Sequence, residues 1–104
     1  MSGPTLWVSR AVIEDTIRLA ALEVPGVCRV GRGGAAWARW VAGPAIRIER
    51  GPDSVAVSVT LVARPAQPLV PLTRSVRAAV TTAVERTLDL EAGPVTVIVD
   101  GVGS

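Results

Sequence analysis

Apolar residues recur at the spacing of an amphipathic helix in two segments of the chain. The first segment follows Ser9, a good N-cap residue, and ends at Pro25-Gly26. The second runs from about Pro71 to about Leu90. Each segment therefore predicts a helix with one apolar face, formed by Ile13, Ile17, Ala20, Ala21 and Val24 in the first and by Leu72, Val76, Val80, Ala83, Val84 and Leu88 in the second.

Other segments alternate apolar and polar residues, which is the pattern of a half-buried strand. Residues 45–50 and 55–63 alternate on either side of the turn residues 51–54, and predict a β-hairpin. Residues 95–100 alternate again and predict a last strand. The helix between them is long enough for a crossover, so the last strand can run parallel to the second hairpin strand.

These elements predict a two-layer α+β fold with the order (β)αββαβ, where the leading strand is the short segment 6–8. Two one-sided helices then cover one face of a small mixed sheet of three to four strands. A chain of 104 residues has the size of one domain, which we assign to 1–104. The second sheet face stays open to solvent or a partner, and carries Arg47, Glu49, Ser58, Thr60, Val62 and Thr96.

The residue types that are missing exclude most common catalytic chemistry. The sequence has no His, Lys, Tyr or Phe, and Cys28 is its single cysteine. Imidazole bases, Schiff bases, internal disulfides and ordinary zinc sites are therefore ruled out. We expect no enzyme activity, no cofactor, no metal and no small-molecule substrate. There is also no apolar run near the length of a transmembrane helix and no secretory signal. The single cysteine fits a reducing cytosol, so we expect a cytoplasmic protein, either free or peripheral at the inner face of the membrane.

Four segments, in this order, resemble one bacterial family. They read VS at 8–9, ALEVPGV at 21–27, SVRAAV at 75–80 and VTVIVDGV at 95–102. The chain resembles the alkaline shock protein (Gls-type) envelope stress response family over about residues 6–102. The resemblance implies a non-enzymatic protein of cell-envelope homeostasis and stress, with a protein partner that is membrane-anchored in some members and self-assembly in others. It implies no catalytic residues.

A Gly-rich segment gives a different hypothesis, because Gly31, Arg32, Gly33 and Gly34 follow an apolar residue as in a KH domain. In that family a Gly-X-X-Gly loop clamps the nucleic-acid backbone. Arg32 and Arg39 lie in a stretch, residues 27–50, with five arginines and one acid. The alternatives are an RNA-binding module and a plain surface loop. The net charge of the whole chain, +2, is too small to decide between them.

Trp37 and Trp40 lie three residues apart, so a helix would place them side by side with Arg39 nearby. They either cap the open end of the core or contact a partner or a membrane surface. The mean hydropathy of +0.44 is high for a small domain and favours a buried contact, including one with a second copy. The candidate partner surface predicted from the sequence is Trp37, Arg39, Trp40, Arg47, Thr60 and Val62.

Overall fold

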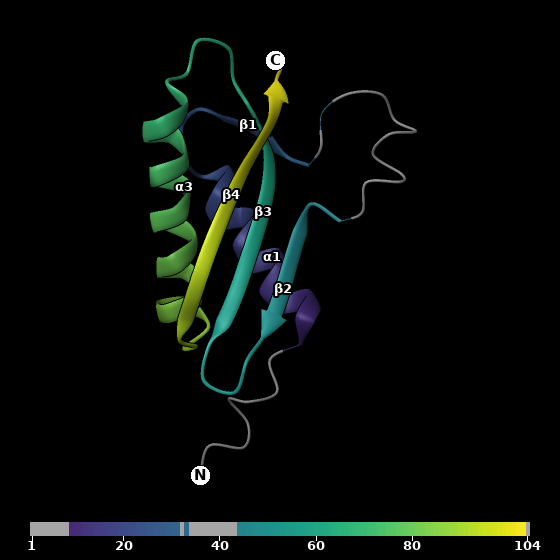
Figure 1. The fold of residues 1–104 in the computed structure, drawn as a ribbon, viewed down its shortest axis with the longest axis vertical. Coiled ribbons are helices and arrows are strands. Elements are labelled where there is room, and N and C mark those ends of the chain that lie inside the picture. The colour runs from purple at the N-terminus through teal and green to yellow at the C-terminus, as the bar shows by residue number, and fades with distance from the viewer. Residues whose placement is uncertain (1–8, 32, 34–43, 104) are drawn as a thin grey trace.

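The computed structural model describes residues 9–31, 33 and 44–103. Its elements follow the predicted order, with one further short strand after the first helix (Figure 1). They are α1 (Arg10–Leu22), β1 (Val27–Val30), β2 (Ile46–Arg50), β3 (Val55–Ala63), α3 (Leu69–Thr82), the π-helical turn η2 (Ala83–Thr87) and β4 (Ala92–Val102).

β3 is the central strand of the sheet. On one side it pairs in parallel with β4 along its whole length, from Val55 opposite Ala92 to Ala63 opposite Val102. On the other side it pairs antiparallel with two strands in succession, first β2 and then β1. The sheet is therefore mixed, and the predicted hairpin and parallel last strand are both confirmed.

Both helices lie on the same side of the sheet, with α3 beside β4 and α1 behind β2 and β3 (Figure 1). The core forms between the layers because each element contributes its apolar face. Its largest fully buried side chains are Ile13 and Ile17 from α1, Val59 and Leu61 from β3, Val76 and Val80 from α3, and Val84 from η2. The two-layer α+β prediction is confirmed, and the leading strand at 6–8 lies outside the described residues.

The second helix differs from its predicted limits at both ends. It begins at Leu69, two residues before Pro71, because a proline in the first turn removes an N–H group that has no helical partner there. Its last turn is π-helical, with the Leu88 N–H donating to the Ala83 carbonyl at 3.1 Å. Asp89 then takes a left-handed conformation (φ 56°) and turns the chain toward β4, so the helix ends before Leu90.

The last strand is longer than predicted. It runs from Ala92 to Val102 and includes Gly93-Pro94, which precede the predicted residues 95–100. Proline is tolerated there because β4 is an edge strand, with β3 as its only strand partner among the described residues. Near its end, the register shifts between Leu61 and Ala63, and Gly101 has the positive φ of 113° that such a bulge requires.

Candidate interaction surface

The backbone of Thr60 in β3 is bonded to the chain where β1 ends and where β2 begins, the two strands that pair with the same edge of β3. The Gly31 N–H donates to the Thr60 carbonyl at 2.9 Å, and the Thr60 N–H donates to the Ala45 carbonyl at 2.8 Å. The residue after β1 and the residue before β2 are therefore bonded to the same position of β3. The candidates Arg32, Gly34, Trp37, Arg39 and Trp40 lie between these two residues in the sequence and outside the described residues.

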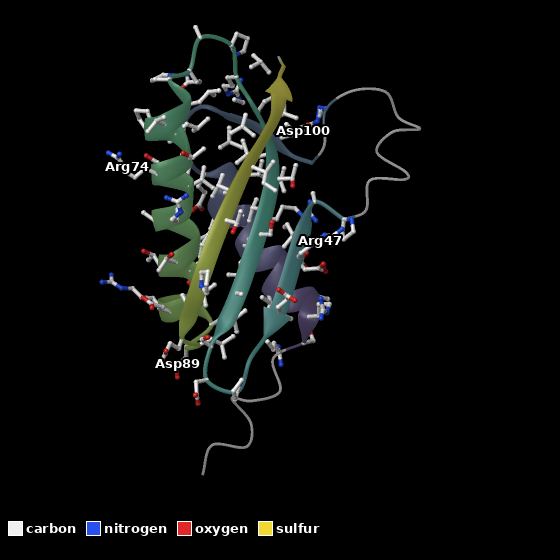
Figure 2. The ribbon with its side chains drawn as sticks, in the orientation of Figure 1. Arg47, Arg74, Asp89 and Asp100 are labelled. Carbon is white, nitrogen blue, oxygen red and sulfur yellow. The ribbon has the colours of Figure 1, made fainter. Side chains whose placement is uncertain are left out.

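Gly33, three residues after the end of β1, is bonded to β4, a strand that does not pair with β1. Its N–H donates to Asp100 Oδ2 at 3.0 Å, and its backbone lies so close to the Asp100 carbonyl that a side chain would not fit. Asp100 lies on the upper part of β4 (Figure 2), which is separated from β1 by β3. The chain has thus crossed the open sheet face here.

This crossing corrects part of the predicted partner surface. Thr60 and Val62 lie on the open face of β3, as the alternation predicted, but each is only 2% exposed. They are flanked by β1 and β4, and Gly103 lies so close that a Cβ there would be 3.2 Å from Val62 Cγ1. The prediction that these two side chains offer a free surface is therefore wrong. Arg47 is exposed, as predicted.

The rest of the open face stays accessible and forms the surface that we consider here. The register places Arg47, Ser58 and Thr96 in one row across β2, β3 and β4. Glu49 and Ala56 form the next row. An open hollow of about 820 Å³ adjoins these rows. This part of the face is therefore charged on β2, small in the middle and uncharged at Thr96 and Ile98 of β4, of which Ile98 is 43% exposed.

The two outer edges of the sheet are each occupied by an arginine from a helix. Arg10 Nη1 of α1 donates to the Ile48 carbonyl of β2 at 3.2 Å. Arg77 Nε of α3 donates to the Val95 carbonyl of β4 at 3.1 Å. A strand added at either edge would have to displace a charged donor, and charged groups at edges are a known protection against edge pairing. The open face is thus the more accessible side for a partner.

Metal-binding groups are sparse in the described part of the chain. No cluster of three or more His, Cys, Asp or Glu side chains there could hold a metal ion. Cys28 is a free, half-buried thiol. Among the residues described, no helix has the length and apolar content needed to cross a membrane.

Comparison with known proteins identifies the fold. No protein-family model matches the chain, and no curated protein matches it. Solved structures of the MamM CTD are similar to it. The H264A variant has a TM-score of 0.65 and 17% identity, covering 89% of this chain and 98% of that one. A structure titled as the copper form has a TM-score of 0.57 and 17% identity over 88% of this chain and 85% of that one.

A structure titled as the zinc form of a MamM CTD variant has a TM-score of 0.59 and 17% identity, covering 90% of this chain and 87% of the other. At this identity the likeness shows the fold alone. The donors present here do not fit a copper or zinc site, because both metals favour Cys and His ligands. The sequence has no His and one Cys, and the residues described include no group of three Cys, Asp or Glu side chains that could hold a metal ion.

Proposed function

We propose that the domain is a non-catalytic interaction module that binds a second copy of itself through the accessible part of the open sheet face. The observation that carries this proposal is the arrangement of opposite charges on β2. Arg47 and Glu49 are both exposed and point to the same face, two residues apart. A two-fold axis that crosses the strands near Ile48 would place Arg47 opposite the partner's Glu49, and Glu49 opposite the partner's Arg47.

The middle of the face suits the same arrangement. The axis would place Ser58 opposite the partner's Ala56, and these small side chains allow two sheets to approach to about 10 Å. The face consists of a few residues from each of three strands about 4.8 Å apart, so the area buried between two copies would be at the low end of the range for protein interfaces. We therefore expect a dimer that forms at micromolar rather than nanomolar concentration, on the order of 10⁻⁶ M.

Charge reversal tests this geometry by sedimentation equilibrium. Arg47→Glu or Glu49→Arg alone places like charges opposite each other twice in the dimer and should abolish it, because such contacts are unfavourable at an interface. The double variant Arg47→Glu/Glu49→Arg restores both pairs and should restore the dimer. Arg18→Glu, on the exposed side of α1, serves as the control. Failure of the double variant to recover would contradict the proposal.

The biological setting is a further part of the proposal and rests on the resemblance to the alkaline shock (Gls-type) family. On that basis the module acts in the cytoplasm in envelope homeostasis and stress, with a membrane-anchored protein as one class of partner. The fold is compatible with this role. Recovery of the protein with the membrane fraction of stressed cells, in a form that salt releases, would support it, and exclusion from that fraction would count against it.

RNA binding through Gly31, Arg32, Gly33 and Gly34 stays a prediction. Two observations weigh against it. The residues before Gly31 form a strand, and the Gly33 N–H already donates to Asp100. Fluorescence anisotropy with single-stranded RNA at low and physiological salt separates the two functions, because phosphate contacts weaken steeply as salt rises. Tight binding that Arg32→Glu removes would favour the nucleic-acid function.

A further inference from the structure

One long stretch of this chain carries basic residues and no acidic residue. No acidic residue occurs between Asp53 and Glu85, a stretch that contains Arg64, Arg74 and Arg77. All three arginines are exposed. Arg64 lies on the loop after β3, and Arg74 and Arg77 lie on α3. Figure 2 shows Arg74 on the outer side of that helix. Asp89 lies at the other end of the same view.

Two aliphatic side chains are exposed at the start of α3, next to these arginines. Leu69 is 44% exposed and Val70 is 67% exposed. Helical spacing places Val70, Arg74 and Arg77 along one stripe. Because helical side chains lean toward the N-terminus, Arg74 extends toward the exposed valine one turn before it. Arg77 lies a turn further on, and its Nε donates to the Val95 carbonyl of β4. The end of the molecule is thus an apolar tip with cationic side chains around it, defined by Arg64, Leu69, Val70 and Arg74.

Two carboxylates from other elements lie toward this end. Glu23 follows α1, whose connection to β1 contacts the loop residue Gln67 and Leu72 of α3 at Gly26. Asp100 on β4 accepts the N–H of Gly33 and faces the open side of the sheet. Neither lies on the stripe formed by Val70 and the two arginines, so the tip itself presents positive charge only.

We propose that this tip docks on an anionic lipid surface. The aliphatic pair would enter the headgroup boundary, and the arginines would bind the acidic headgroups while their stems follow the apolar side chains inward. A lipid surface fits better than a nucleic acid, because the exposed aliphatic side chains of Leu69 and Val70 would leave water there, beside the arginines. The proposal does not depend on the dimer, since the tip lies outside the open sheet face.

Co-sedimentation with vesicles tests this proposal on the full chain. Vesicles of phosphatidylcholine with phosphatidylglycerol should bind the protein at low salt, and phosphatidylcholine alone should not. Arg64→Glu/Arg74→Glu should lower the affinity for these vesicles by at least about 25-fold, since each arginine near such a surface raises the affinity about fivefold. Leu69→Asn/Val70→Asn should also lower it, because the apolar anchor is lost. Arg77 is left unchanged because it also binds the Val95 carbonyl.

Matched controls change the same residue types on α1. Leu19, which is 62% exposed, becomes Asn, and Arg18 becomes Glu. These variants should bind vesicles as the parent does. Equal losses in the control and tip variants, or no binding to the acidic vesicles at low salt, would overturn the proposal. So would tighter binding of a single-stranded RNA that depends on the same tip arginines.

Discussion

The backbone of Thr60 is bonded to two different parts of the chain at one position of β3. Its carbonyl is bonded to the residue after β1, and its N–H is bonded to the residue before β2. Two strands far apart along the chain are therefore joined at one position of β3. Periodicity predicted that Thr60 faces away from the core. Its burial could not be predicted, because that depends on where Gly33 and β1 lie and not on the alternation of β3.

The bond between Gly33 and Asp100 gives a testable prediction. Asp100→Ala removes the acceptor of the Gly33 N–H, whereas Asp100→Asn keeps an oxygen at the same place. Loss of one such bond typically costs about 1 kcal/mol. We expect the Gly33 amide to exchange with solvent about fivefold faster in the Ala variant and nearly unchanged in the Asn variant. Hydrogen exchange followed by NMR measures this, and identical rates in both variants would contradict the contact.

At the scale of elements, the pattern of apolar positions predicted the helices and the hairpin because each element buries one face. The limits of α3 and β4 were less predictable, because Pro71 and Pro94 usually interrupt structure. Here each proline occupies a position that needs no N–H donor, in a first helical turn and on an edge strand. The succession of β2 and β1 on one edge of β3 depends on long-range register, which no local pattern contains.

The connection from α1 to β1 is a second place for a prediction. Gly26 has φ 101°, and a Cβ there would lie 2.5 Å from Gln67 Oε1 and 3.1 Å from Leu72 Cδ1. Gly26→Ala should therefore lower the free energy of unfolding by about 1–3 kcal/mol. The control is Gly51→Ala, where the nearest atom, the Ser54 carbonyl oxygen, would be 3.5 Å away. Urea unfolding measures both, and equal stability of the two variants would contradict this account.

At the scale of the whole molecule, three surfaces have different properties. The sheet edges each bind a helix arginine at a carbonyl. The open face pairs opposite charges on β2 with small residues on β3, and the tip of α3 combines apolar and basic side chains. Composition predicted a non-catalytic domain that contacts a partner. It could not locate the contact, because exposure depends on how β1, Gly33 and Arg77 cover the rest of the sheet.

The most direct test of the central claim is the molar mass of the chain in solution as its concentration is raised. Binding through the open face predicts a mass that rises from 10.8 kDa toward twice that value. Ser58→Arg, in the middle of the face, should keep the mass at that of one chain, and Ala78→Arg on the exposed side of α3 should dimerise like the parent. A constant mass of 10.8 kDa for the parent, or a dimer that Ser58→Arg leaves intact, would contradict the account.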